Sequence, residues 1–181
     1  MEYSAKSMTK KIVLDCEKLS RIAEGLRDAG FSIVATIGSW DLLHIGHLRY
    51  LMKAKTYGDI LIVGTDSDRA IKLYKNPLRP IVPEDERMEM LSYQSCVDFI
   101  TLVDDVDDKG KWQYGLLEHI KPDVFIAVEN SYPEEQKQDI EKLCGKLVVL
   151  PRQAEKTSTS GLVQETIKKH LLEMLSSLER R

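Results

Sequence analysis

Short, continuous apolar runs alternate with segments of helical periodicity along most of this chain. Segments of helical spacing predict helices over residues 17–30, 47–58, 84–95, 112–120, 134–145 and 160–181. Five runs of strand length occupy residues 31–37, 59–65, 98–103, 122–128 and 146–150. Runs that are apolar throughout, rather than alternating in polarity, are typical of strands buried on both faces of a parallel sheet. The sequence therefore predicts an α/β fold: a Rossmann-like, doubly wound, five-stranded parallel sheet in a single domain.

Length and composition set the limits of this prediction. The 181 residues suit one domain, for which we expect a disordered N-terminus at residues 1–10 and a folded part at 11–181. A net charge of −3 with no polybasic block argues against a nucleic acid or a membrane as partner. Cys16, Cys96 and Cys144 are widely spaced, and no signal peptide is visible, so we expect reduced thiols and a cytoplasmic location.

Two of the four histidines, His44 and His47, lie just after the first apolar run and at the start of the next helix. A spacing of three residues puts both on one side of a helical turn. Gly46 between them lets a ligand approach the backbone, and a helix start offers free N–H groups. This combination predicts an anion site.

Two other interpretations of the pair are open at this point. The histidines could begin a metal site, but two imidazoles supply only part of the three or four ligands that zinc normally takes. They could also be surface residues of a helix with no role. An H-x-G-H sequence at a strand-to-helix junction favours the anion site over both.

Two segments resemble signatures of the nucleotidylyltransferase superfamily. "GSWDLLHIGHLRYL" (38–51) resembles its D-x-x-H-x-G-H signature, and "TSTSGL" (157–162) resembles its Ser/Thr cluster at the start of the last helix. "IKLYKNPLRPIVPEDERMEML" (71–91) is similar to a loop and helix of heptose 1-phosphate adenylyltransferase domains. "LPRQAEKTSTS" (150–160) is similar to the end of glycerol-3-phosphate cytidylyltransferases. The segment "AVENSY" (127–132) departs from the pattern of both groups.

The resemblance implies an enzyme in which an acceptor phosphate attacks the α-phosphorus of a nucleoside triphosphate. It implies catalytic roles at the phosphates for His44, His47 and Lys75. It implies nucleotide-binding roles for Ile37, Gly38, Ser39, Trp40, Gly46, Glu129, Arg152, Thr157, Ser158, Thr159 and Ser160. It implies roles in binding the acceptor substrate for Asp41, Asp68, Arg79 and Arg87.

For several of these residues a structural role is open beside the functional one. Arg87 could reach the substrate phosphate or form a salt bridge with a neighbour. Asp68 could cap a helix, Ser158–Ser160 could do the same, and Arg79 could only bound a turn. The triphosphate implies Mg²⁺ as cofactor, with Asp41 as the nearest protein ligand.

The resemblance predicts transfer of a nucleoside monophosphate, AMP more readily than CMP, to a phosphorylated sugar or polyol such as heptose 1-phosphate. The alternatives are a cytidylyltransferase acting on glycerol 3-phosphate or a similar ester, and a non-catalytic nucleotide-binding module. A zinc hydrolase built on the histidine pair is a further alternative. A homodimer is expected from the resemblance alone.

Overall fold

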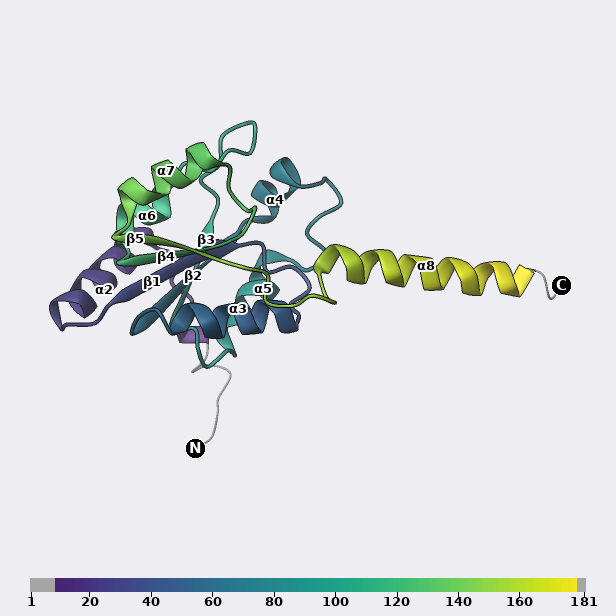
Figure 1. The fold of residues 1–181 in the computed structure, drawn as a ribbon, viewed down its shortest axis with the longest axis horizontal. Coiled ribbons are helices and arrows are strands. Elements are labelled where there is room, and N and C mark those ends of the chain that lie inside the picture. Colours follow the sequence, from purple (N-terminus) through teal and green to yellow (C-terminus); the bar gives the residue numbers. More distant parts are fainter. Residues whose placement is uncertain (1–8, 179–181) are drawn as a thin grey trace.

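The computed structural model describes residues 9–178, and it contains a parallel sheet covered by helices on both faces (Figure 1). Neighbouring strands are parallel, in the order β3-β2-β1-β4-β5. The strands are β1 (Ile33–Gly38), β2 (Ile60–Asp66), β3 (Phe99–Val103), β4 (Val124–Val128) and β5 (Lys146–Leu150). The predicted doubly wound, five-stranded sheet is confirmed.

The strand order reverses between β1 and β4. These two strands pair only at Val34↔Val124 and Ala35↔Phe125, whereas β1 pairs with β2 along its whole length. Beyond Ala35 the strands separate, and the Ile126 carbonyl accepts from the side chains of Thr36 and Tyr50, each at 2.9 Å. The separation opens a crevice at the carboxyl ends of the strands, where ligands of such sheets usually bind.

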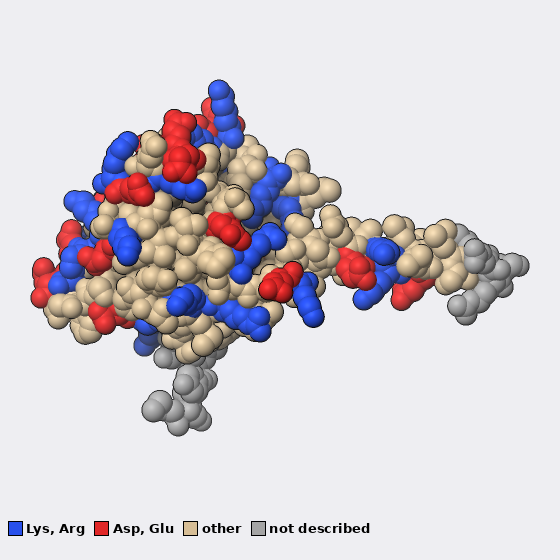
Figure 2. Space-filling model, viewed as in Figure 1, with Lys and Arg blue, Asp and Glu red and all other residues tan. Residues whose placement is uncertain are grey.

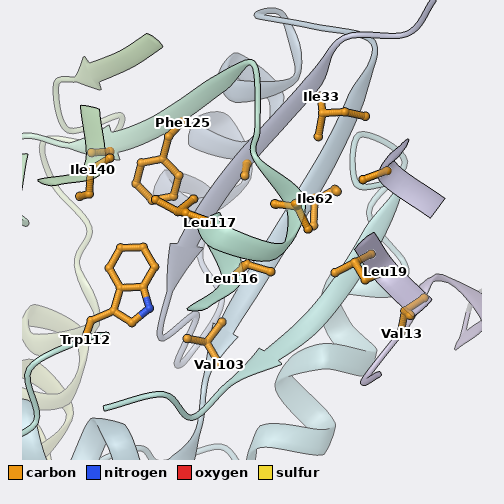
Figure 3. Packing of buried hydrophobic residues seen from close by; sticks show 14 residues of the cluster. Val13, Leu19, Ile33, Ile62, Val103, Trp112, Leu116, Leu117, Phe125 and Ile140 are labelled. Atoms are coloured by element: carbon orange, nitrogen blue, oxygen red, sulfur yellow. The ribbon is translucent and has the colours of Figure 1, made fainter. Parts of the chain in front are cut away.

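Two hydrophobic clusters hold the layers together. One lies between the sheet and the helices α2 (Cys16–Asp28), α6 (Gly115–Ile120) and α7 (Glu134–Leu143), and Figure 3 shows its buried side chains. The other lies between the opposite sheet face and α3 (Ile45–Lys55) and α5 (Glu84–Ser92). Burial on both faces is the reason why the strands are apolar at successive positions.

The observed helices differ from the predicted ones at two places. The helix α4 (Asp68–Tyr74) is not predicted from the sequence. The helix expected from residue 112 begins instead at Gly115, because Trp112 forms an antiparallel bridge with Val106 and Tyr114 takes a left-handed conformation (φ 64°). Of the segment predicted to be disordered, residues 1–8 lie outside the described residues, and residues 9 and 10 belong to the 3-10 helix η1 (Thr9–Lys11).

The last helix, α8 (Thr159–Leu178), leaves the body of the molecule and extends alone (Figure 1). Its surface is mostly uncharged in Figure 2, whereas acidic and basic side chains alternate over the visible face of the body. Large apolar side chains on α8 are 42–58% exposed: Leu162, Ile167, Leu171, Leu172, Met174 and Leu175. Within residues 9–178, no helix has the length and apolar character needed to span a membrane.

Candidate active site

The two histidines lie at the start of α3, beside the crevice. His44 is the N-cap residue, and its Nδ1 accepts a hydrogen bond from the Gly46 N–H at 3.1 Å. The His44 and His47 rings stack with their centroids 3.9 Å apart. Because Nδ1 of His44 is an acceptor, its proton must be on Nε2, which remains a donor. A Cβ on Gly46 would lie 2.9 Å from the His44 ring and 3.0 Å from the Ala154 side chain, so only glycine fits there.

Both imidazoles are neutral at neutral pH. Burial, together with His44 and Lys75 nearby, lowers the pKa of His47 to about 4, and burial also lowers the pKa of His44. The Nδ1 atom of His47 is buried and has no hydrogen-bond partner among residues 9–178. Buried polar atoms in native proteins are nearly always paired. This pair of rings therefore has donor capacity that the rest of the protein does not use.

Trp40 fixes the position of His47. The Trp40 backbone is left-handed (φ 51°), its side chain is buried, and its indole N–H donates to the Gly64 carbonyl at 2.9 Å. The edge of the ring faces His47, with centroids 5.6 Å apart. Its contacts make Trp40 a support of the histidine pair as well as part of the cavity wall.

Asp41 connects the histidine segment to the proline-rich loop after α4. Its carboxylate is buried and accepts from the Arg79 guanidinium at 2.7 Å and from the N–H groups of Ile81 and Val82, both at 3.0 Å. These three donors hold the Asp41 carboxylate against the Arg79 side chain and the backbone of the loop. Asp41 therefore fixes the loop, and its roles as a substrate contact and an Mg²⁺ ligand stay predictions.

The Ser/Thr cluster reaches the same place from the other end of the sequence. The Thr159 hydroxyl donates to the Asp41 carbonyl at 2.9 Å, and the Arg79 guanidinium donates to the Ser160 hydroxyl at 3.3 Å. The Ser158 hydroxyl accepts from the Gly161 N–H at 3.1 Å, as an N-terminal cap of α8. The two signatures, more than a hundred residues apart, thus form one site.

These segments enclose a cavity of about 350 Å³ at the crevice between β1 and β4. Fifteen predicted site residues line it: Ile37, Gly38, Ser39, Trp40, Asp41, His44, Gly46, His47, Lys75, Arg79, Arg152, Thr157, Ser158, Thr159 and Ser160. Residues that the sequence analysis does not predict also line it, and among them are Tyr50, Ser131, Tyr132 and Gln153. Ser131 and Tyr132 follow β4 directly, and this position beyond a strand end is a signal that could have identified them.

Lys75 brings a cation into this cavity. It is the C-terminal cap of α4, and its ammonium group donates to the Ser39 hydroxyl at 2.7 Å. Burial lowers the pKa of Lys75, which the Asp66 carboxylate opposes. A positive charge beside two neutral imidazoles favours the binding of an anion.

Three predicted residues do not line the cavity. The Arg87 guanidinium is fully buried and donates to the Asp68 carboxylate at 2.7 Å and the Asp66 carbonyl at 2.8 Å. Its remaining donors bond to the carbonyls of Ser39 and Val82. Arg87 therefore forms the salt bridge, the second of its two predicted roles, and supports the ends of β1 and β2 instead of contacting a substrate.

The two acidic residues of this group are also engaged elsewhere. Asp68 pairs with Arg87, and Ser67 rather than Asp68 caps α4, so the predicted cap is wrong, while the role of Asp68 in binding the acceptor stays a prediction. The Glu129 carboxylate accepts from the Arg152 backbone N–H at 3.2 Å, at the surface. This contact couples the ends of β4 and β5.

A second cavity of about 730 Å³ adjoins the first. The two cavities share the lining residues Ile37, Gly38, Ser39, Lys75, Ser131 and Tyr132. The second one is further lined by Asp66, Tyr74, Trp112 and the lysines Lys109 and Lys111. The site therefore has room for two ligands that meet at a common wall.

Within residues 9–178, no three His, Cys, Asp or Glu side chains lie together in a way that could hold a metal ion. A catalytic zinc site needs three protein ligands. The residues present do not fit the zinc-hydrolase alternative.

Comparison with known proteins agrees with this geometry. A family model described as cytidylyltransferase-like matches residues 35–179. The chain is 30% identical to the bifunctional protein HldE of Syntrophotalea carbinolica over 165 residues, which are 87% of this chain and 33% of that protein. It is 41% identical to the HldE protein of Helicobacter acinonychis over 120 residues, 66% of this chain and 24% of that protein. The chain thus spans a third or less of the length of these relatives.

Solved structures support the same assignment. The lipopolysaccharide core biosynthesis protein from Thermoplasma volcanium is 29% identical and superposes with a TM-score of 0.57, over 69% of this chain and 100% of that chain. The pantoate-beta-alanine ligase from Francisella tularensis also gives a TM-score of 0.57, over 80% of this chain and 67% of that chain. At 18% identity it supports the fold alone. The match over residues 35–179 shows that the chain belongs to the cytidylyltransferase-like family, within the nucleotidylyltransferase superfamily.

Proposed function

We propose that this nucleotidyltransferase transfers AMP, more readily than CMP, from a nucleoside triphosphate to the phosphate of a sugar or polyol such as heptose 1-phosphate. One observation carries the proposal: the neutral histidine pair, Lys75 and the start of α8 line one cavity at the switch point of the sheet. The similarity to HldE proteins favours adenylyl transfer to a sugar phosphate. Transfer of CMP to glycerol 3-phosphate is the second candidate, favoured by the family model.

The chemistry is a substitution at phosphorus. An oxygen of the acceptor phosphate forms a bond to the α-phosphorus, the bond from that phosphorus to the bridging oxygen of the β-phosphate breaks, and pyrophosphate leaves. No proton has to be removed from an ionised acceptor phosphate, so the reaction needs no general base and no protein nucleophile. The enzyme would accelerate the reaction by positioning the two reactants and by stabilising the negative charge of the transition state.

The residues of the first cavity suit these tasks. We assign the N–H groups of His44 and His47 to the α- and β-phosphates, where hydrogen bonds strengthen as charge moves to the leaving group. Ser158, Thr159 and Ser160 at the start of α8, together with Arg152, would hold the β- and γ-phosphates. Lys75, which lines both cavities, would neutralise charge on the two reactants at once. Ile37–Trp40 would form the wall beside the nucleotide.

Mg²⁺ would enter bound to the triphosphate. In the part of the chain that the structure describes, no three His, Cys, Asp or Glu side chains could hold a metal ion together, and the Asp41 carboxylate, which accepts three hydrogen bonds, would offer the ion one oxygen at most. Mg²⁺ commonly keeps several waters and is held mainly by substrate phosphates.

A homodimer formed through α8 would explain its exposed apolar side. Ile167, Leu171 and Met174 are spaced by four and three residues, the seam of a two-helix coiled coil. The exposed side chains each offer on the order of 100 Å², so two copies would bury about 1,000 Å² of apolar surface, near the lower limit for a stable interface. A second copy of this chain is therefore the partner we propose for this face.

The test is release of pyrophosphate by the wild-type protein. ATP and CTP should each be paired with heptose 1-phosphate and with glycerol 3-phosphate, with Mg²⁺ present. We expect the fastest turnover for ATP with heptose 1-phosphate. Binding of a triphosphate without turnover for any pair would support a non-catalytic nucleotide-binding module and reject the proposed function.

A further inference from the structure

Tyr132 stands at the wall between the two cavities, in a segment where the sequence departs from the pattern of similar enzymes. It lines both cavities and lies four residues after the end of β4. Its ring centroid is 6.1 Å from that of Trp112 and 6.3 Å from that of Phe125. Trp112 and Phe125 belong to the buried core (Figure 3), so the ring of Tyr132 is held by rigid neighbours.

Three tyrosines line these cavities, Tyr50, Tyr74 and Tyr132, and their hydroxyl groups differ in their hydrogen-bond partners. The Tyr50 hydroxyl bonds with Thr36 and the Ile126 carbonyl. The Tyr74 hydroxyl donates to the Asp66 carboxylate. The Tyr132 hydroxyl has no hydrogen bond to any residue within 9–178. A half-buried phenol with a fixed ring and an unused donor is suited to a ligand.

The surroundings of this hydroxyl keep its proton in place. Burial raises the pKa of Tyr132 well above its usual value, and the nearby Asp66 carboxylate acts in the same direction. The group is therefore a hydrogen-bond donor at every pH at which the protein would work. Lys75, the cation of the common wall, is bonded to Ser39 in the same wall.

The common wall is also where the reacting atoms have to meet. If the triphosphate occupies the first cavity, an acceptor in the second meets it at the shared wall, to which Ser39, Lys75 and Tyr132 belong. The attacking group is a phosphate dianion, which needs donors that hold it in line without removing its charge. Lys75 supplies the positive charge, and the neutral Tyr132 hydroxyl supplies a hydrogen bond that orients the phosphate.

We propose that the Tyr132 hydroxyl donates a hydrogen bond to the acceptor phosphate at the junction of the two cavities and so positions it for attack. The inference rests on the proposed function and adds to it a substrate-contact residue and the location of the acceptor in the second cavity. The acceptor class is then a phosphate ester whose remaining part extends toward Trp112.

The test compares Tyr132→Phe with Tyr114→Phe. Both changes remove one hydroxyl and keep the ring. Tyr114 packs against the same Trp112, at 4.8 Å between centroids, but lines neither cavity. Steady-state rates would be measured with ATP and heptose 1-phosphate, or with whichever pair the wild type uses fastest. Thermal unfolding would check that both variants fold.

For Tyr132→Phe we expect kcat/KM for the acceptor to fall roughly 10- to 100-fold, the value of one hydrogen bond to a charged group. The KM for ATP should change by less than about twofold, and Tyr114→Phe should behave like the wild type. Calorimetric titration with α,β-methylene-ATP should give equal affinities for the wild type and Tyr132→Phe.

Two results would overturn the inference and leave the proposed function standing. One is wild-type kinetics in Tyr132→Phe, and the other is a loss that appears in the KM for ATP or in the affinity for the analogue. An inactive wild type would instead remove the proposed function, and this inference with it. The wild-type rate measured in the same assay separates the two kinds of failure.

Discussion

The imidazole rings of His44 and His47 lie face to face, 3.9 Å between centroids, with both pKa values lowered by burial. Two protonated rings at this distance would repel each other, so the stack requires at least one neutral ring. At neutral pH both rings are neutral, and each keeps one N–H as a donor. The arrangement gives an anion two directed hydrogen bonds without adding a charge that would have to be screened when the site is empty.

The lowered pKa of His47 predicts a pH dependence of stability. Between its unfolded pKa of 6.5 and its folded pKa of about 4, the unfolded chain binds a proton that the native state does not. The free energy of unfolding should therefore fall as the pH drops from 6.5 toward 4, by up to about 3 kcal/mol from this residue. Urea unfolding at pH 5 and 7.5 should show a smaller difference for His47→Gln than for the wild type. His170→Gln, a change at an exposed histidine, provides the control and should keep the pH dependence of the wild type. If the free energy of unfolding of His47→Gln depends on pH as steeply as that of His170→Gln, His47 is not the residue responsible.

Gly46 and Gly25 offer a matched pair of substitutions. Gly46→Ala forces a methyl group against the His44 ring and Ala154, so it should displace the ring and reduce kcat/KM by about 100-fold or more. Gly25 lies inside α2 with open space around its Cα, so Gly25→Ala should stabilise the protein by about 0.5–1 kcal/mol and leave turnover unchanged. Rates and urea unfolding of both variants check the prediction. Full activity in Gly46→Ala would contradict the described contact.

Lys75 and Lys72 lie on the same short segment but differ in environment. Both lysines are exposed, but Lys75 lines both cavities and Lys72 lines neither. Lys75→Met should reduce kcat/KM roughly 100- to 1000-fold, because neither reactant would then have the positive charge that we assign to neutralising its phosphates. Lys72→Met should stay within about twofold of the wild type. Equal effects of the two changes on the rate of pyrophosphate release would show that the general charge of α4 matters instead.

The buried pair of Asp41 and Arg79 predicts a large effect on stability. Asp41→Ala leaves Arg79 without its carboxylate and leaves two backbone N–H groups unpaired, so it should destabilise the protein by about 3–5 kcal/mol. Asp139→Ala removes an exposed pair with Lys142 and should change stability by less than about 1 kcal/mol. The comparison is made by urea unfolding. A loss in Asp41→Ala no larger than that in Asp139→Ala would mean that the pair does not hold the loop.

The exposed side of α8 predicts the oligomeric state. Light scattering after size exclusion should give a dimer for the wild type and a monomer for Leu171→Glu, which puts a charge in the middle of the apolar seam. Lys169→Glu changes charge nearly opposite on the helix, given 3.6 residues per turn, and should remain dimeric. A monomeric wild type at micromolar concentration would reject the second copy as the partner of α8.

The strands and the meeting of the two signatures could be predicted from the sequence for the same reason. Parallel strands place their carboxyl ends at one edge of the sheet, so segments that follow β1 and β5 must lie near each other. His44 and Ser158 therefore share a cavity although the sequence separates them widely. Both residues stand at the start of a helix among small and polar residues, and this pattern can be recognised in the amino-acid sequence.

Roles that depend on tertiary packing could not be predicted in this way. Arg87 is charged and suits a phosphate, but four carbonyl and carboxylate partners from three segments enclose it. The helix α4 is only seven residues long, and it depends on the Ser67 cap and on the burial of Ile71. Tyr132 could be placed beyond β4, but its position between two cavities follows from its contacts with Trp112 and Phe125.

The early separation of β1 and β4 has a consequence for how such a protein can change. The opening lies where the pairing of β1 with β4 stops after Ala35 and the Thr36 and Tyr50 side chains bond to the Ile126 carbonyl instead. Under the proposed function, replacements after β3 and β4 would change the part of the site assigned to the acceptor, while α3 and α8, assigned to the triphosphate, would stay unchanged. New specificities can therefore arise on this scaffold by exchanging surface segments, with no redesign of the interior.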